Sequence, residues 1–288
     1  ARAHFELLMS SQRKCGAQGA AVLLQEFLRG TEYIVDMVSR DGAHKTALVW
    51  VYDRRPANGG DFVNFGQSCV LADSPIAQEL IAYTTGCLDA LRVTNGATHT
   101  EIMMTADGPC LVEVNSRAHG AAGAWMPLAQ ALTGYTQVGA CVDAFVDPGA
   151  FDALPDLPPS PFLADGQVVM VISFHEGVLE ATPGFDRIRA LRSFVSLEEH
   201  VRAGGRLERT VDLFTVSAMC VLVHPDAEVL ALDVAAVRRM EVDGSLWAFS
   251  EQEDSPTSAA TRKPSGMSVK SDKSGESTAT TTSTVSGA

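Results

Sequence analysis

The feature that most constrains the fold is the segment 98–120, which reads THTEIMMTADGPCLVEVNSRAHG. Two stretches of alternating apolar and polar residues, 99–105 and 110–117, flank a turn sequence that contains Asp107-Gly108. Side chains alternate between the two faces of a strand, and Asp-Gly is typical of tight hairpin turns. The segment therefore predicts an antiparallel β-hairpin.

The length of the loop decides whether the acidic residues of this hairpin share a site. A two-residue turn at Asp107-Gly108 would pair Glu101 with Val114 and place Glu101 and Glu113 on opposite faces of the sheet. A three-residue loop over 106–108, with glycine in the left-handed conformation, pairs Glu101 with Glu113 instead. We expect this second register, which also pairs His99 with Asn115 and leaves Arg117 on the same face.

Two carboxylates that lie directly opposite each other in a sheet repel, so a cation is expected between them. Mg²⁺ prefers oxygen ligands and is usually held by one or two carboxylates together with substrate phosphates. Glu101, Glu113 and the amide oxygen of Asn115 would supply such ligands, and Arg117 could stabilise negative charge on a transferring group. The alternative is an exposed hairpin that carries ordinary surface acids.

This hairpin resembles the metal-binding hairpin of the ATP-grasp superfamily, which includes biotin carboxylase and D-alanine–D-alanine ligase. The shared pattern is a Glu on one strand and Glu-x-Asn-x-Arg on the next, here starting at Glu101 and Glu113. Residues 25–28 (QEFL), followed by the sequence GTEY over 30–33, are similar to the hinge strand of that superfamily. The resemblance implies that five residues bind ATP, four around adenine and the last near the ribose: Gln25, Glu26, Phe27, Leu28 and Glu32.

Other segments resemble one branch of the superfamily, the L-amino acid ligases and carnosine-synthase-like enzymes. They are residues 33–39 with Val35-Asp36, the run HTE at 99–101 and the run RAHG at 117–120. Residues 61–75 depart from the branch, whose members commonly place a substrate-facing His or Glu there. These ligases phosphorylate a carboxylate with ATP and let an amine attack the acyl phosphate.

The resemblance to this branch implies the cofactors and site roles of the chain. ATP and Mg²⁺, with Mn²⁺ as an alternative, would be the cofactors, and the substrates would be small-molecule amino acids or carboxylates. Arg117 would be the catalytic residue that steadies the acyl phosphate. Substrate would be bound by His99, His119 and Gly120, although His119 could instead only cap the segment that follows it.

The rest of the chain predicts an α+β fold. Strands are expected over 21–27, 32–39 and 45–52, and helices over 74–91, 126–131 and 137–145. A second block, after the proline-rich link 156–162, predicts strands over 168–175, 194–201, 209–220 and 221–223. The resemblance implies the C-terminal part of an ATP-grasp fold, with an antiparallel sheet and flanking helices. The expected divisions are an ATP-grasp portion over 1–150, a small α+β C-terminal subdomain over 163–249 and a disordered tail over 250–288.

Composition narrows the class of protein further. The formal net charge of −13 argues against a nucleic-acid partner, because such partners select basic surfaces. No apolar run approaches the roughly 18 residues of a membrane-spanning helix, and six scattered cysteines without a CxxC pair favour reduced thiols. We expect a cytoplasmic protein without a membrane partner, and a homodimer is compatible with the sequence.

Two features predict that the chain is a fragment of a ligase with impaired or absent turnover on its own. Residues 1–8 (ARAHFELL) read as the interior of a helix without a cap, and no initiator methionine precedes them. Before the tail the only lysines are Lys14 and Lys45, and no glycine-rich phosphate loop is present. The alternatives are a non-catalytic nucleotide-binding ATP-grasp module and a biotin-carboxylase-like enzyme.

Overall fold

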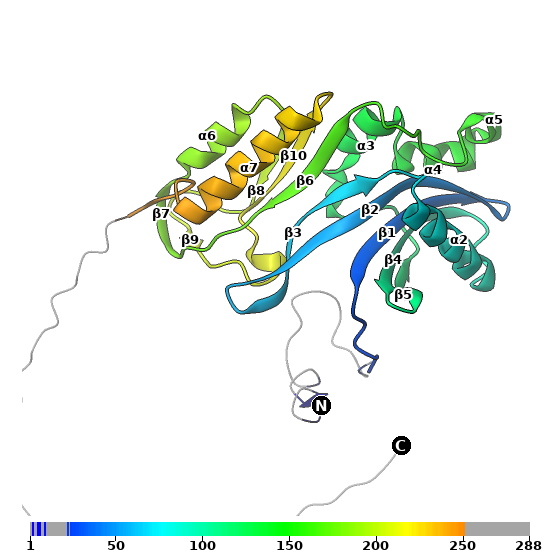
Figure 1. Cartoon of the computed structure of the whole chain (residues 1–288), viewed down its shortest axis with the longest axis horizontal. Coiled ribbons are helices and arrows are strands. Elements are labelled where there is room, and N and C mark those ends of the chain that lie inside the picture. The colour runs from blue at the N-terminus through cyan, green and yellow to red at the C-terminus, as the bar shows by residue number, and fades with distance from the viewer. Residues whose placement is uncertain (1, 3–4, 7–8, 10–21, 23, 251–288) are drawn as a thin grey trace, which may run out of the picture. The chain divides into compact units, whose positions relative to one another are not determined.

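The computed structural model describes residues 24–250 together with Arg2, Phe5, Glu6, Met9 and Val22 (Figure 1). The expected disordered tail lies outside the described residues except for Ser250, and most of the expected N-terminal helix over 1–8 lies outside them as well. The described residues up to Ser250 belong to one compact unit. No helix among them is long and apolar enough to cross a bilayer.

An eight-stranded sheet forms the centre of the described fold, and every neighbouring pair of its strands is antiparallel. From one edge to the other the strands are β5 (Gly108–Asn115), β4 (Gly96–Thr105), β1 (Thr31–Arg40), β2 (Ala43–Ala57), β3 (Gly60–Val70), β6 (Asp165–Val171), β10 (Ala218–His224) and β8 (Phe194–Glu199). A small second sheet has the order β11 (Ala248–Phe249), β7 (Gly177–Ala181) and β9 (Arg206–Leu207).

Helices cover both faces of the large sheet, which confirms the expected α+β fold (Figure 1). The helices are α2 (Pro75–Ala90), α3 (Met126–Thr133), α4 (Gln137–Val146), α5 (Pro148–Ala153), α6 (Pro183–Arg189) and α7 (Ala227–Asp243), with 3-10 turns at Ala121–Gly123 and Leu213–Thr215. Ile34, Trp50 and Val168 pack beneath α3 on one face, whereas Val35 and Val49 pack beneath α2 on the other. Because β1 is covered on both sides, its sequence is a nearly continuous apolar run.

The structure confirms three of the predicted helices and the strands expected over 32–39 and 45–52. The N-cap of α2 is Ser74, whose side chain accepts a hydrogen bond from the Ala77 amide, and Pro75 occupies the first turn. The expected helices over 126–131 and 137–145 correspond to α3 and α4. Strands expected over 32–39 and 45–52 correspond to β1 and to the first part of β2, which continues to Ala57.

Two expected strands are wrong. Residues 24–27, the described end of the strand expected over 21–27, have no regular secondary structure. Residues 209–217, within the strand expected over 209–220, form a loop and a 3-10 turn before β10 begins at Ala218. Asp212 starts that turn, because its side chain accepts hydrogen bonds from the amides of Phe214 and Thr215 and so favours a capped turn over an extended chain.

The sheet also continues through strands of the second block, because β6 pairs with β3 and β10 pairs with β6. The β3 strand was not expected, since residues 60–70 contain two glycines and an asparagine, which weaken a strand signal. The division of the chain into a 1–150 portion and a 163–249 subdomain stays a prediction.

The β4–β5 hairpin has the expected register at its acidic residues but a different loop. Thr105 pairs with Gly108 across a two-residue turn, and a β-bulge then places one extra residue, Val112, on β5. Beyond the bulge Glu101 pairs with Glu113, as the sequence predicted. The expected three-residue loop is therefore wrong, and it is the bulge that supplies the one-residue shift that brings the two glutamates to the same face.

Candidate functional site

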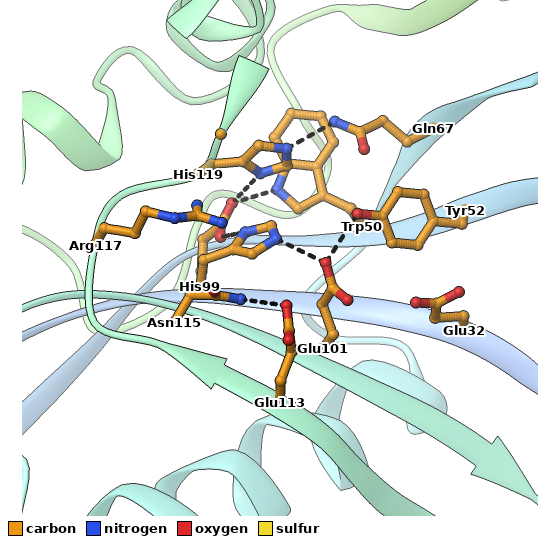
Figure 2. A network of polar contacts seen from close by, with 12 residues as sticks. Glu32, Trp50, Tyr52, Gln67, His99, Glu101, Glu113, Asn115, Arg117 and His119 are labelled. Carbon is orange, nitrogen blue, oxygen red and sulfur yellow. Dashed lines mark hydrogen bonds and ion pairs between the residues drawn. The ribbon is translucent and has the colours of Figure 1, made fainter. Parts of the chain in front are cut away.

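The β4–β5 hairpin presents its two glutamates side by side on the face of the sheet that α3 covers elsewhere (Figure 2). Glu113 is exposed, and its Oε1 accepts a hydrogen bond of 2.8 Å from Asn115 Nδ2. Since the amide nitrogen is the group used, the Asn115 oxygen remains available as a ligand. The Glu101 side chain is only 16% exposed, and its Oε1 lies 3.1 Å from the Tyr52 hydroxyl and 3.2 Å from His99 Nε2.

Behind this pair lies a buried carboxylate, Asp36, in the middle of β1. Its Oδ1 accepts a hydrogen bond of 2.9 Å from His99 Nδ1, and its Oδ2 accepts bonds of 2.8 Å from His119 Nδ1 and 2.7 Å from Trp50 Nε1. The donors come from β4, from the loop after β5 and from β2. A buried charge is tolerated only when it is paired in this way, so the three donors explain how Asp36 lies inside the core.

The pKa values of this network follow from its burial and its pairing. Burial alone would raise the pKa of Asp36, but the charge and hydrogen bonds of His119 and His99 outweigh burial and hold it at about 2, below the ordinary 3.8. Burial likewise opposes protonation of His99, yet hydrogen bonds to Asp36 and Glu101 raise the His99 pKa to about 9. The pKa of Glu101 is lowered, because its contacts with His99 and Tyr52 outweigh its burial. His99 is therefore an imidazolium held between two carboxylates at neutral pH.

The ligand atoms of Asp36, His99 and His119 lie within 4.8 Å of one another, a spacing that could hold a metal ion. Two imidazole nitrogens are poor ligands for Mg²⁺, which prefers oxygen. Each imidazole Nδ1 already donates to an Asp36 oxygen, and the Trp50 indole adds a donor that cannot ligate. The chemistry of this cluster is that of a hydrogen-bonded charge network, whereas Glu101, Glu113 and Asn115 offer the oxygen donors that suit Mg²⁺.

A cavity of about 240 Å³ opens against this network. Its polar lining includes Glu101, His99, His119 and Arg117, and its apolar lining includes Met170 from β6. The other residues that line it are Tyr52, Asn64, Gln67, Gly120, Ala121, Trp125, Val168, Leu213 and Met219. The volume matches a compact ligand of about the size of an amino acid, below the roughly 300–1,000 Å³ of drug-sized pockets.

The loop after β5 is held in place by buried hydrogen bonds. The His119 amide donates to Gln137 Oε1 at 2.8 Å, and Trp125 Nε1 donates to the Gly120 carbonyl at 2.8 Å. The next two residues, Ala121 and Ala122, have φ values of 54° and 49°, which are strained for a residue with a side chain. The strained turn directs the loop across the cavity, which both His119 and Gly120 line.

Arg117 lies two residues beyond the end of β5 and is not part of the strand, contrary to the expected strand over 110–117. Its side chain is exposed, and its Nη1 donates to the neighbouring Ala118 carbonyl at 2.9 Å. Arg117 nevertheless lines the cavity together with Glu101 and His99, so the structure brings these three expected site residues together.

The residues expected to bind ATP lie in two places, Glu32 on β1 and residues 25–28 in the segment before it. Glu32, on β1, forms an ion pair with Arg54, whose guanidinium lies 4.2 Å from the centre of the Tyr52 ring. Burial raises the pKa of Glu32, and the Arg54 charge offsets this only in part. Phe27 instead contacts Phe62 of β3, with ring centres 5.7 Å apart. The cavity lining contains none of Gln25, Glu26, Phe27 and Leu28.

Sequence reasoning gave no role to several side chains that the structure places in the site, namely Asp36, Trp50, Tyr52 and Gln67. Asp36 carried a usable signal, because an acid inside the apolar run YIVDMV must be buried and therefore paired. Tyr52 and Gln67 carried none, since their positions depend on how β2 and β3 pair with the rest of the sheet.

Comparison with known proteins agrees with this geometry. Residues 3–121 match the family model of the ATP-grasp domain. Over these residues, which are less than half of the chain, the sequence is similar to an ATP-grasp domain. Dapdiamide A synthase from Enterobacter agglomerans is 24% identical over 242 residues, which cover 83% of this chain and 56% of the relative. Carnosine synthase 1 from Gallus gallus is 32% identical over 105 residues, which cover 35% of this chain and 11% of the relative.

Solved structures support the same fold. The L-amino acid ligase from Bacillus licheniformis aligns with a TM-score of 0.62 at 15% identity, covering 78% of this chain and 55% of the ligase. Phosphoribosylglycinamide synthetase from Anaerococcus prevotii aligns with a TM-score of 0.57 at 12% identity and the same coverages, 78% and 55%. The chain thus spans about half the length of dapdiamide A synthase and of both structures.

Proposed function

We propose that this chain carries the metal and substrate side of an ATP-dependent carboxylate–amine ligase of the amino-acid ligase type, acting through an acyl phosphate. One observation carries the proposal, namely the direct pairing of Glu101 with Glu113 on β4 and β5. Two carboxylates in this position repel and would destabilise a bare hairpin by up to about 1 kcal/mol. A divalent cation turns this repulsion into a binding site.

The donor set fits Mg²⁺, with Mn²⁺ as an alternative. Glu101, Glu113 and the free amide oxygen of Asn115 are hard oxygen donors on one face of the hairpin. When bound by these residues, the ion would neutralise negative charge that develops during phosphoryl transfer. Glu32 and residues 25–28 are the proposed contacts of the ribose and adenine of ATP.

The protein side chains around the cavity have separate roles in this proposal. Arg117 supplies a permanent positive charge where the acyl phosphate would lie. The His99 imidazolium fixes Glu101 through the bond from Nε2, so the proposed metal ligand is held in one orientation. The cavity accepts a small amino acid or carboxylate, and His119 and Gly120 line it as the proposed substrate contacts.

The proposal is tested by measuring ADP formation with Mg²⁺-ATP and a panel of standard L-amino acids, alone and in pairs. Glu101→Gln and Glu113→Gln should each lower ADP formation by at least about tenfold, because even partners outside the metal's own ligand set change affinity or activity by about 10–100-fold. Glu180→Gln, an exposed glutamate on β7, is the matched control and should behave like the wild type. ATP binding without ADP formation, measured in a full-length protein that contains this chain, would indicate a non-catalytic nucleotide-binding module instead.

A further inference from the structure

The two buried histidines share the Asp36 carboxylate but differ at their second ring nitrogen. His99 Nε2 faces a carboxylate oxygen of Glu101 at 3.2 Å, whereas His119 Nε2 faces the side-chain nitrogen of Gln67 at 3.0 Å. A carboxylate only accepts hydrogen bonds, and an amide nitrogen only donates them. His99 therefore donates from both nitrogens, while His119 donates from Nδ1 and accepts at Nε2.

This difference leaves one ring nitrogen in the cavity lining, His119 Nε2, that accepts a hydrogen bond rather than donating one. Five titratable side chains line the cavity: Tyr52, His99, Glu101, Arg117 and His119. The Tyr52 hydroxyl donates to Glu101, and Glu101 is the proposed metal ligand. Neither ring nitrogen of His99 has a lone pair free, and arginine does not act as a base in proteins. Of these five groups, only His119 has a ring nitrogen, Nε2, whose lone pair accepts a hydrogen bond from an N–H donor, here the Gln67 amide. Such a nitrogen can accept a proton.

We propose that His119 is the general base of the ligation step and that Asp36 is the residue that positions it. The inference rests on the proposed function, because it assigns the fate of the proton that the amine must lose. His119 Nε2 now accepts a hydrogen bond from the Gln67 amide N–H, and an N–H of the attacking amine would take the place of that donor. Asp36 holds Nδ1 at 2.8 Å, which fixes the tautomer and stabilises the imidazolium once the proton has arrived.

The step balances with the groups named. The lone pair of the amine nitrogen forms the C–N bond to the acyl carbon, and the C–O bond to the phosphoryl group breaks. Phosphate leaves with that electron pair, and the proton lost by the nitrogen passes to His119 Nε2. Contacts of the imidazole with the rings of Trp50 and Trp125, at 5.1 and 5.0 Å between centres, hold it in place during the transfer.

Hydroxylamine allows the role of the base to be tested apart from formation of the acyl phosphate. It attacks an acyl phosphate as a neutral nucleophile and needs little help from a base. The experiment gives the purified chain Mg²⁺-ATP, a panel of standard L-amino acids and either hydroxylamine or no additive. The ratio of amide product to hydroxamate is measured by mass spectrometry. In His119→Gln this ratio should fall by about 10²–10⁴-fold, the usual contribution of a general base. Asp36→Asn should lower the ratio in the same direction, and His200→Gln, outside the site, should leave it at the wild-type value.

The outcomes separate this inference from the proposed function. An unchanged ratio in His119→Gln, with hydroxamate still formed, overturns the base and leaves the ligase proposal standing. If neither this chain nor a longer protein that contains it forms hydroxamate or ADP, both proposals are overturned.

If His119→Gln fails to fold, nitrogen-15 NMR of the wild-type protein at alkaline pH tests the inference by giving the tautomer of the His119 imidazole. A proton on Nδ1 and none on Nε2 supports the inference, and a proton on Nε2 overturns it.

Discussion

Replacing Asp36 by asparagine keeps the size of the side chain and removes the charge that both histidines face. The pKa of Asp36 lies at about 2 against an ordinary 3.8, and a difference of this size corresponds to roughly 2–3 kcal/mol of folding stability. An asparagine can also present only one oxygen to three donors, so at least one buried donor loses its partner. We therefore expect Asp36→Asn to lower the free energy of unfolding by about 2–4 kcal/mol at pH 6.

The pH dependence of that loss identifies its cause. The depressed pKa of Asp36 contributes stability above pH 4, and this contribution is lost as the pH falls from about 4 towards 2. The raised pKa of His99 contributes stability below pH 6.5, which is lost as the pH rises towards about 9. The difference between wild type and Asp36→Asn should therefore be largest between about pH 4 and 6.5 and should shrink on both sides.

Urea unfolding of wild type and variant from pH 3.5 to 9.5 measures this difference, provided that the slopes with urea agree between the two proteins. Asp61→Asn, an exposed acid on β3, is the matched control and should change stability by no more than about 0.5 kcal/mol. A difference that stays constant from pH 6 to 9.5, or that is below about 1 kcal/mol at pH 6, would refute the charge network as the origin of the stability.

Three further substitutions test other parts of the structure. Ala122→Gly should raise stability by about 0.5–1 kcal/mol, because glycine adopts a φ of 49° without strain; a lower melting temperature would contradict this. Trp50→Phe should lower it by about 1–3 kcal/mol through loss of the indole donor to Asp36, and urea unfolding would show an unchanged midpoint if that bond were unimportant. Gly66→Ala should lower it by about 3 kcal/mol or more, since a Cβ would lie 2.1 Å from the Val168 carbonyl oxygen at a φ of 141°; normal expression and melting would count against this packing.

The hairpin and its chemistry could be predicted from sequence because alternation is a local property. Residues 98–117 carry both strands, their turn and their acids within one short stretch, so pairing needs no distant information. The bulge at Val112 could not be predicted, since no glycine or other characteristic residue marks its position in the sequence. The correct register was thus predicted with the wrong loop.

The buried network could not be predicted in full, because its members lie far apart in the chain. Asp36, Gln67 and His119 come from three different segments, and only the strand order β4-β1-β2-β3 brings them together. The strand expected over 209–220 failed for a different reason. Its apolar residues match a strand pattern, but Asp212 offers the backbone a competing capped turn.

The bulge on β5 makes the hairpin respond unequally to gaining and to losing a residue. A ladder that ran without interruption from the Thr105–Gly108 pair would set Val112 opposite Glu101 and turn Glu113 to the far side of the sheet. Deleting Val112 would remove the bulge and still leave Glu113 opposite Glu101. Inserting one residue at the same point would instead leave two unpaired residues on β5. A one-residue deletion at Val112 should therefore disturb the pairing of the two glutamates less than a one-residue insertion there.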